Sequence, residues 1–422
     1  MPEAPPPDAG QAVGAPIERL DGAEKVAGTE IFGADVRPPE AALMVRAVRS
    51  PLHAAAFSFG DLEAWRAARP GVTAVFTAAD IPGRNRFGVI PPFADQPALA
   101  EGHVRFRGEA VALVAGEPAA MEALDLADFP DIWTEKPHNL TLPAGADDIH
   151  PERPGNVLIS GYVACGDVRS ALAGAVHVVE GTVDTAYVEH AYIEPEAGMA
   201  WMEGDTLVIR TCTQAPAMDR DDTAAILGLP PERVRMIPTA AGGGFGAKLD
   251  ISLQPLIGLV TLKTGRPARM AYSRHESMIS TTKRHPGRMR ARIGADADGR
   301  IVAMRFDGDF NTGAYASWGP TVANRVPVHA CGPYLTPAYR AEARAIHTNG
   351  PPSGAFRGFG VPQAAILQET LYDDLADAVG LDRLVFRRLQ HLPGRRRVAV
   401  GQRVQAAAAT GAEYESSHGA GV

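Results

Sequence analysis

The sequence predicts an α+β protein with two structural domains. Its 422 residues are about three times the length of a usual domain, so two or three domains are expected. Hydrophobic residues make up 45% and charged residues 21%, an ordinary globular composition that can build real cores. Strand-like and helix-like segments follow one another without an internal repeat. These observations exclude a largely disordered protein and a long helical bundle.

The first predicted domain covers residues 20–145 and follows a Pro- and Ala-rich arm, residues 1–19, that we expect to be disordered. Its segments have the order β-α-β-β-β-α, which is typical of a small α/β domain. Strands are expected at 42–48, 72–76, 104–106 and 110–115, the last two as a pair around Gly108, and helices at 61–69 and 119–126. Residues 146–155 are rich in Pro and acidic residues, so we expect a linker there.

The second predicted domain covers residues 156–392. Strands are expected at 175–183, 206–212 and 234–238, a hairpin at 289–293 and 301–306, and helices at 219–227, 249–264 and 364–379. In the helix at 249–264, Leu249, Leu253, Leu256 and Val260 share one face, which predicts burial of that face. After residue 392 no periodicity remains, so residues 393–422 are expected to form an irregular tail.

Charge and cysteine content narrow the function classes. The net charge of −8 gives no summed attraction for a phosphate backbone, so nucleic acid is not an expected partner. Cys165, Cys212 and Cys331 are far apart and odd in number, which predicts no disulfide framework and fits a reducing cytoplasm. No apolar run reaches 18 residues, and the first ten residues lack the features of a secretion signal. We therefore expect a cytoplasmic protein without a membrane segment.

A glycine-rich loop, Gly242–Lys248, lies between a predicted strand and a predicted helix and reads GGGFGAK. Glycines allow positive φ and a close approach of the backbone to a ligand. One interpretation is a turn that only needs glycine. A second is dinucleotide binding, because Gly242, Gly244 and Ala247 satisfy G-x-G-x-x-A, but the acid expected about 20 residues later is missing. The third depends on other motifs in the chain.

Three more motifs accompany this loop. They are Thr213–Pro216 (TQAP), Asn324–His329 (NRVPVH) and Gly354–Gly360 (GAFRGFG). An uncharged Gln can hydrogen-bond a metal-oxo group without displacing it, and a planar Arg offers a fork of donors to an oxyanion. Two Gly/Phe loops, an amide and two arginines suit a bulky, anionic, hydrogen-bonding cofactor.

Together the motifs resemble the molybdenum-cofactor subunit of the xanthine dehydrogenase/aldehyde oxidase family over most of residues 20–390. The similar segments are GGGFGAK at 242–248, GAFRGFG at 354–360, EHAYIEP at 189–195, KRHP at 283–286 and NTGAY at 311–315. Residues 49–51 and 104–112 are similar to the family's α/β hammerhead domain. The resemblance implies that this hammerhead domain is followed by the first half of a molybdenum-cofactor-binding domain.

The resemblance also implies an activity, its cofactors and its partners. Members of the family hydroxylate an electron-poor carbon of an N-heterocycle or an aldehyde, with water as the oxygen source. This chain would bind the molybdenum-pterin cofactor, and a two-iron, two-sulfur cluster and FAD would reside on an iron–sulfur subunit and an FAD subunit. The cofactor performs the difficult chemistry, while the protein orients the substrate and stabilises charge.

The motif match assigns expected roles near the metal. Gln214 would hydrogen-bond the apical oxo group, and the backbone of Gly244, Phe245 and Gly246 would line the metal. In the second loop, Ala355 and Phe356 would contact the cofactor, and Arg357 would place its backbone N–H near an equatorial ligand. We therefore take Gln214, Phe245 and Arg357 as the expected neighbours of the molybdenum.

Three further residues are implied at the substrate. Phe359 would form a wall that stacks on a planar ring. Arg325 would be catalytic, by stabilising negative charge that builds on the substrate. Leu249 occupies the position at which xanthine-oxidising members carry a purine-binding glutamate. A leucine accepts no hydrogen bond, so xanthine is in doubt as the substrate.

The family's general-base glutamate belongs to a C-terminal half that this sequence does not reach. The resemblance therefore implies a separate C-terminal molybdenum-domain chain as a partner. Two alternatives stay open at this point. One is a catalytically incompetent remnant or assembly subunit, and the other is an NAD-dependent dehydrogenase that uses the glycine loop.

Overall fold

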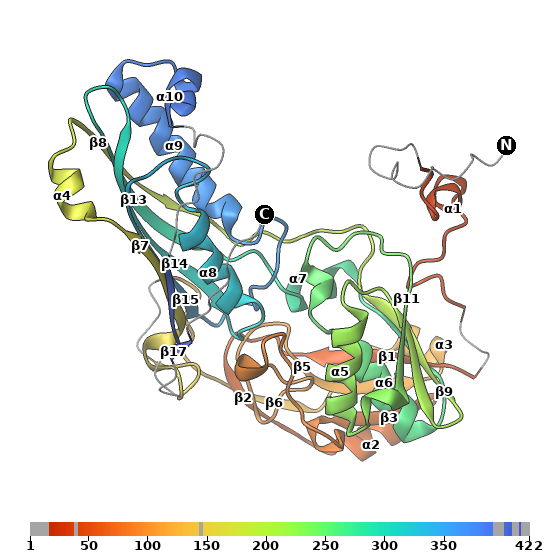
Figure 1. Ribbon diagram of the computed structural model, residues 1–422. Coiled ribbons are helices and arrows are strands. Elements are labelled where there is room, and N and C mark those ends of the chain that lie inside the picture. Colours follow the sequence, from red (N-terminus) through yellow and green to blue (C-terminus); the bar gives the residue numbers. More distant parts are fainter. Residues whose placement is uncertain (1–16, 38–40, 143–146, 391–400, 407–412, 415–422) are drawn as a thin grey trace.

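The computed structural model describes residues 17–37, 41–142, 147–390, 401–406 and 413–414, so most of the disordered arm predicted at 1–19 lies outside the described residues. These residues form two lobes, each built around a seven-stranded sheet (Figure 1). Loops at the junction of the lobes carry the motifs that the sequence singles out. The observed mixture of sheets and covering helices confirms the predicted α+β class.

The first large sheet combines strands from both predicted domains. Its order is β11-β10-β9-β12-β1-β5-β3. The strands are β1 (Leu43–Arg49), β3 (Val72–Thr77), β5 (Ala110–Gly116), β9 (Ala197–Glu203), β10 (Thr206–Thr211), β11 (Val234–Pro238) and β12 (Ala268–Ala271). Strand β1 pairs in parallel with β12, Leu43 opposite Ala268. The sheet thus crosses the predicted linker, and hydrogen bonds join the two predicted domains.

Two helices cover this sheet, α5 (Pro216–Leu227) and α6 (Gln254–Thr264). Fully buried Leu113, Ile209 and Ile257 belong to the core between the sheet and these helices. Helix α6 begins five residues later than predicted, because Asp250 turns its carboxylate into the interior and Leu253 caps the helix ahead of Pro255. Leu249 therefore lies in a short 3-10 turn, Ala247–Leu249, and not on the buried face of the helix.

A small three-stranded sheet lies beside the first. Its order is β4-β2-β6, with β2 (Ala55–Phe59), β4 (His103–Val104) and β6 (Asp131–Glu135). The predicted pairing of 104–106 with 110–115 is wrong, because β4 pairs with β2 while β5 joins the large sheet. Helices α1 (Gly22–Ala27), α2 (Leu62–Ala67) and α3 (Pro118–Ala123) complete this part of the chain. Asp61 caps α2 by accepting a hydrogen bond from the backbone N–H of Ala64.

The second large sheet has the order β17-β16-β7-β15-β14-β13-β8. Its strands are β7 (Val157–Cys165), β8 (His177–Asp184), β13 (Gly287–Ala295), β14 (Ile301–Gly313), β15 (Ala338–His347), β16 (Gly401–Ala406) and β17 (Glu413–Tyr414). Strands β16 and β17 lie in the tail that we expected to be irregular. Strand β16 pairs antiparallel with β7, Gly401 opposite Ala164, so part of the predicted irregular tail is a strand.

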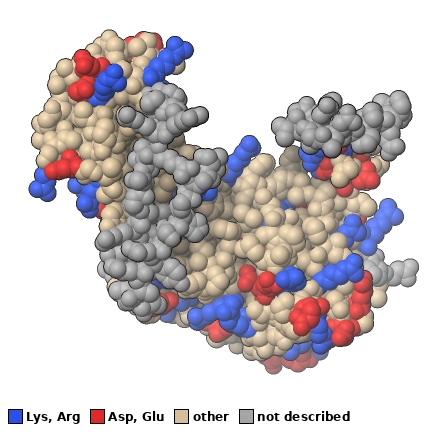
Figure 2. Space-filling view, in the orientation of Figure 1, with Lys and Arg blue, Asp and Glu red and all other residues tan. Residues whose placement is uncertain are grey.

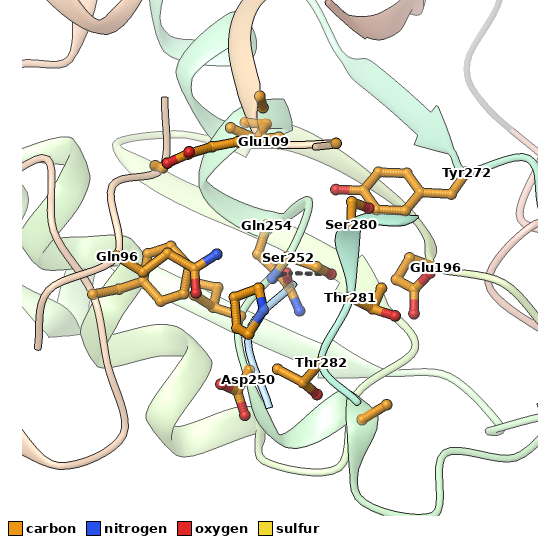
Figure 3. Close-up of a pocket in the computed structure, with 18 of the residues that line it drawn as sticks. Gln96, Glu109, Glu196, Asp250, Ser252, Gln254, Tyr272, Ser280, Thr281 and Thr282 are labelled. Atoms are coloured by element: carbon orange, nitrogen blue, oxygen red, sulfur yellow. Dashed lines mark hydrogen bonds between the residues drawn. The ribbon is translucent and has the colours of Figure 1, made fainter. Parts of the chain in front are cut away.

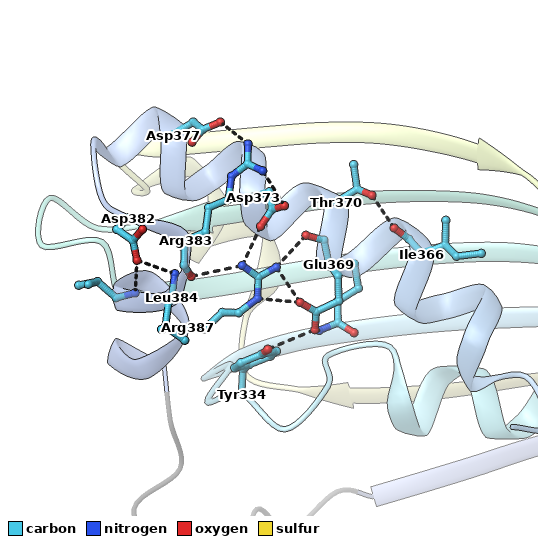
Figure 4. A network of polar contacts seen from close by, with 12 residues as sticks. Tyr334, Ile366, Glu369, Thr370, Asp373, Asp377, Asp382, Arg383, Leu384 and Arg387 are labelled. Carbon is cyan, nitrogen blue, oxygen red and sulfur yellow. Dashed lines mark hydrogen bonds and ion pairs between the residues drawn. The ribbon is translucent and has the colours of Figure 1, made fainter.

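Helices α8 (Gly319–His329) and α9 (Val361–Val379) pack on one face of the second sheet (Figure 1). Helices α4 (Val168–Ala173), α7 (Arg274–Ser280) and α10 (Arg383–Leu389) are shorter. Arg387 fixes α10 to α9 by donating to Glu369 at 2.8 Å and to Asp373 at 2.7 Å (Figure 4). The opposite face of the sheet carries cross-strand ion pairs such as Arg344 with Asp309, at 2.7 Å.

The surface charges and the cysteines bear on the predicted function classes. Lysine, arginine and acidic side chains are interspersed on the face that Figure 2 shows. Cys165, Cys212 and Cys331 are free thiols, as predicted. Among the described residues, no helix combines the length and the apolar character needed to cross a membrane.

Candidate functional site

The two Gly/Phe loops contact each other at the junction of the lobes. The loop at 242–248 follows β11 of the first sheet, and the loop at 354–360 precedes α9 on the second sheet. The backbone N–H of Arg357 donates to the carbonyl of Phe245 at 2.8 Å. A Cβ on Gly246 would lie 2.5 Å from the carbonyl oxygen of Ala355, so only glycine permits this approach. The two motifs, 112 residues apart, thus form one surface.

Both loops hold a phenylalanine in the left-handed backbone region. Phe245 has φ 53° and Phe359 has φ 51°. Residues other than glycine seldom adopt positive φ, and such strain gathers at ligand-binding sites. Phe245 also leaves 45% of its surface exposed. The loops thus present aromatic side chains in fixed, partly exposed positions.

Gln214 lies beside the glycine loop, in the segment between β10 and α5. Its side-chain Oε1 accepts a hydrogen bond from the N–H of Gly246 at 3.0 Å, and its backbone N–H donates to the carbonyl of Lys248 at 2.9 Å. A Cβ on Gly244 would lie 2.5 Å from the same Oε1. Because Oε1 is used inside the protein, the exposed amide nitrogen is left to donate outward.

A buried ion pair supports the glycine loop from behind. Lys248 and Glu194, 4% and 9% exposed, form a contact of 2.9 Å between Nζ and Oε2. Glu194 also accepts the N–H of Gly242 at 2.7 Å and the N–H of Gly33 at 2.8 Å. The sequence does not reveal this pair, because Glu194 and Lys248 are 54 residues apart and belong to different motifs.

The ring of Phe356 is held between two side chains. It stacks on His190 with a centroid distance of 3.9 Å, and Arg284 places its guanidinium 3.9 Å from the centroid of the Phe356 ring. His190 also contacts the carbonyl oxygen of Ala355 at 2.8 Å through Nε2. Burial lowers the pKa of His190 to about 4, so its imidazole is neutral at pH 7.

The predicted substrate residues are also brought together in part. Arg325 is exposed on α8, with its guanidinium 5.9 Å from the ring centroid of Phe359. Trp318 packs edge-on against Phe359, with centroids 5.6 Å apart. Leu249 is half-buried in the turn after the glycine loop. The residue that sequence reasoning missed here is Trp318, which adds a second aromatic wall.

One predicted detail needs correction. We expected the backbone N–H of Arg357 to face an equatorial ligand of the metal, yet this N–H is donated to Phe245 within the protein. The contact between the two loops already uses this N–H, so it does not face a metal ligand. The side chain of Arg357 is exposed and stays available.

The donor set tests whether the expected cofactor fits. The site offers an outward amide from Gln214, an exposed guanidinium from Arg357 and strained, glycine-rich backbone, with no His, Cys or carboxylate among these loop residues to ligate a metal. Such a set recognises an anionic cofactor that brings its own metal ligands. The fold and the two loops therefore define a protein that binds an anionic, metal-carrying cofactor.

Comparisons with known proteins indicate the same class of cofactor-binding protein. The family model of the molybdopterin cofactor-binding domain matches residues 149–390, and that of the aldehyde oxidase and xanthine dehydrogenase a/b hammerhead domain matches residues 27–129. The chain belongs to the molybdopterin-binding xanthine dehydrogenase/aldehyde oxidase family, whose members are molybdenum oxidoreductases. The predicted family and the predicted succession of domains are thereby confirmed.

Individual relatives differ in length. The chain is 38% identical over 397 residues to the nicotinate dehydrogenase large molybdopterin subunit of Eubacterium barkeri, covering 93% of this chain and 92% of that one. It is 33% identical over 357 residues to the xanthine dehydrogenase molybdenum-binding subunit of Escherichia coli O157:H7, covering 79% and 46%. Aldehyde oxidoreductase from Desulfovibrio gigas shares the fold with a TM-score of 0.83 and 28% identity, covering 90% and 43%. The chain thus spans less than half of the second and third relatives.

A second polar cluster lies away from the loops and is named here the Arg153 cluster. Asp95, His150 and His347 hold possible ligand atoms within 4.8 Å of one another. Arg153 occupies the space between them, donating to Asp95 at 2.5 Å and contacting Nε2 of His347 at 2.8 Å. The guanidinium thus supplies the positive charge that a metal ion would bring, and we assign no metal there. Part of the predicted linker is therefore buried and tied to both lobes.

Proposed function

We propose that this chain is the cofactor-binding large subunit of a molybdenum hydroxylase that oxidises a planar N-heterocycle or an aldehyde with water as the oxygen source. The single observation that carries the proposal is the contact between the two Gly/Phe loops, with Gln214 and Arg357 presented on their exposed side. The molybdenum-pterin cofactor, when bound, would supply the redox chemistry. Gln214 would donate to its oxygen ligand, and the backbone around Gly244–Gly246 would set its distance.

The substrate slot favours an aromatic ring. Phe359 and Trp318 offer two flat faces at an angle, and Arg325 brings a positive charge to the same place. Leu249 lacks the acceptor that a purine needs, so a smaller heteroaromatic ring is preferred over xanthine. The name of the Eubacterium barkeri relative makes a pyridine carboxylate the first compound to test.

A second polypeptide is part of the proposal. The carboxylate that packs against the glycine loop, Glu194, is used by Lys248 and two backbone N–H groups, so it is not free as a general base. Apolar side chains beside the loops are exposed, Ile193 at 90% and Phe245 at 45%. Arg274 of α7 donates to the carbonyl of Ile193, which holds that residue outward at the rim. Exposed apolar groups around a site usually mark an interface.

The alternatives are weaker on this structure. The family membership leaves the dinucleotide interpretation without support. The high coverage of a named dehydrogenase subunit favours a functional half-subunit over a remnant. Iron–sulfur and FAD subunits remain part of the proposal as electron acceptors, because the described residues contain no cysteine cluster for an iron–sulfur centre.

Molybdenum analysis of the chain alone and with its partner tests the proposal. We expect the isolated chain to lose the cofactor during gel filtration and the complex to keep about one molybdenum per chain. A complex without molybdenum or pterin that instead retains nicotinamide would overturn the assignment. Full retention by the isolated chain would overturn the two-polypeptide cleft.

Replacing Arg325 with Met tests the catalytic role. If the guanidinium stabilises charge that develops only in the transition state, kcat falls by about 10²–10³-fold while KM changes little. Steady-state kinetics of the complex with a heterocyclic substrate measure both. Arg288→Met, on the outer face of the second sheet, is the matched control. An unchanged kcat with a raised KM would show that Arg325 only binds substrate.

A further inference from the structure

A polar cavity of about 60 Å³ adjoins the glycine loop, whose Ala247 and Lys248 belong to its lining. Figure 3 shows Glu109, Asp250 and Thr282 among the side chains around it. Segments from both family domains line it. We call it the Asp250 chamber. Its polar lining includes Arg49, Glu109, Glu196, Lys248, Asp250 and Thr282.

Four buried polar atoms on this chamber have no hydrogen-bond partner in the described protein. They are Nη2 of Arg49, Oε2 of Glu196, Oδ1 of Asp250 and Oγ1 of Thr282. The side chains of Glu196, Asp250 and Thr282 are more than nine-tenths buried. An unpaired buried polar atom is costly, so native proteins satisfy such groups with ordered water. The volume has room for about four to six water molecules.

Asp250 connects this chamber with the candidate site. It follows Leu249 directly, and its Oδ2 accepts the hydroxyl of Ser317 at 2.5 Å. Ser317 precedes Trp318, which packs on the ring of Phe359. One carboxylate oxygen is therefore fixed toward the substrate walls, while the other faces the chamber.

We propose that the Asp250 chamber holds a fixed cluster of water molecules that removes the protons released by the hydroxylation. The inference rests on the proposed function. In that reaction a C–H bond of the substrate and an O–H bond of water break, and a C–O bond forms. Two electrons pass by way of the cofactor to the iron–sulfur and flavin acceptors, and two protons must reach solvent. Within this chain, Asp250 receives protons after the general base of the C-terminal half, and Glu196 and the half-buried Arg49 lie farther along the cluster.

The charges around Asp250 suit this role. Burial, with Asp222 as a nearby like charge, raises its pKa to about 7, while the hydroxyl of Ser317 and the neighbouring Trp318 oppose the rise. Asp219 is a second buried acid whose pKa is raised to about 7 by its burial. A carboxyl that titrates near pH 7 can both accept and release a proton there.

Two readouts that do not depend on turnover test the water cluster. A high-resolution crystal structure of the chain with its partner should show waters within hydrogen-bond distance of Asp250, Glu196 and Thr282, and a dry chamber would overturn the proposal. The difference between infrared spectra of the wild-type chain and Asp250→Asn should show a protonated-carboxyl band that titrates near pH 7, because the bands of Asp219 and Glu109 are common to both proteins and cancel. A difference spectrum without this band would show Asp250 ionised throughout, which also overturns it.

Kinetics test the proton role. Asp250→Asn keeps the acceptor for Ser317, so the fold should survive, and kcat should fall about 100-fold, at the lower limit for proton-transfer groups. KM and molybdenum content should stay unchanged, and the solvent deuterium isotope effect should rise. Asp205→Asn, an exposed acid that does not line the chamber, is the control. A wet chamber with an unchanged kcat would overturn the proton role. A wild-type complex without molybdenum would refute the proposed function, and the proton role with it. The crystal structure would still show whether the chamber holds water.

Discussion

The Asp250 chamber and the Arg153 cluster are two buried polar regions with opposite character. In the Arg153 cluster, the charged and imidazole groups pair within the protein: Arg153 joins Asp95 to His347, and His150 contacts the carbonyl of Ala314 at 2.7 Å. In the chamber, buried polar atoms of Glu196 and other residues face a cavity without a protein partner.

This difference separates structural from functional polarity. A satisfied buried network fixes neighbouring segments, and here it ties the first lobe, the connecting segment and the second lobe together. Unpaired atoms around a cavity instead require a mobile partner such as water. The chamber also adjoins the glycine loop, because Ala247 and Lys248 line it. The hydrogen bonds given above for the Arg153 cluster involve no residue of the two Gly/Phe loops.

Removing the guanidinium from the Arg153 cluster should lower the free energy of unfolding the most. In Arg153→Met, Asp95 and His347 lose their shared partner inside the protein, and breaking a buried pair in this way costs about 3–5 kcal/mol. Chemical denaturation of the purified chain should show this loss of unfolding free energy. Arg344→Met, which removes a half-exposed pair with Asp309, should cost at most about 1 kcal/mol. Equal effects of the two variants would show that the Arg153 cluster is no more important than a surface pair.

The sequence indicated the cofactor loops but not these buried clusters, for a physical reason. Glycine loops and TQAP-like segments are local patterns whose residue types reflect backbone geometry and donor chemistry. The partners of Arg153 and Lys248 lie up to 194 residues away, and no local pattern specifies them. The same limit explains why the sheet shared by β1 and β12 was missed, since that pairing is also long-range.

Element bounds were predicted best where side-chain periodicity and capping agreed. Strands β1, β3 and β10 and helix α9 match their predicted ranges to within a few residues. The predicted start of helix α6 was wrong. An apolar spacing that includes Leu249 is compatible with a helix, but the buried carboxylate of Asp250 and the later Pro255 favour a turn.

A substitution in the chamber should cost much less than one in the Arg153 cluster. Glu196→Gln keeps the shape and the oxygen that accepts the hydroxyl of Tyr192, and water can re-orient toward the new amide. We expect a loss of about 1 kcal/mol or less in denaturation experiments. A loss as large as that of Arg153→Met would indicate a rigid, dry cavity and would remove the contrast between the two regions.

The two regions should also differ in the sign of their contribution to the pH dependence of stability. Burial lowers the pKa of His150 to about 4 and that of His347 well below 6.5. Between pH 6.5 and pH 4 the unfolded chain binds protons that the folded chain does not, so these histidines make stability fall as the pH falls. Burial raises the pKa of Asp250 and of Glu109 to about 7, so these acids make stability fall as the pH rises from about 4 to 7.

The two contributions oppose each other in the wild-type chain, so single variants should reveal them. In Asp250→Asn, one opposing acid is removed, and unfolding free energy should rise more steeply from pH 4.5 to pH 6.5, by at most about 1.4 kcal/mol per pH unit. In His150→Gln, whose amide can still donate to Ala314, the slope should shift the other way. His190 and His285, whose pKa values are also lowered by burial, add the same background to every variant, so only slope differences are compared. Slopes that shift in the same direction would show that Asp250 is ionised in the folded chain, and the chamber would then lose its proposed proton acceptor.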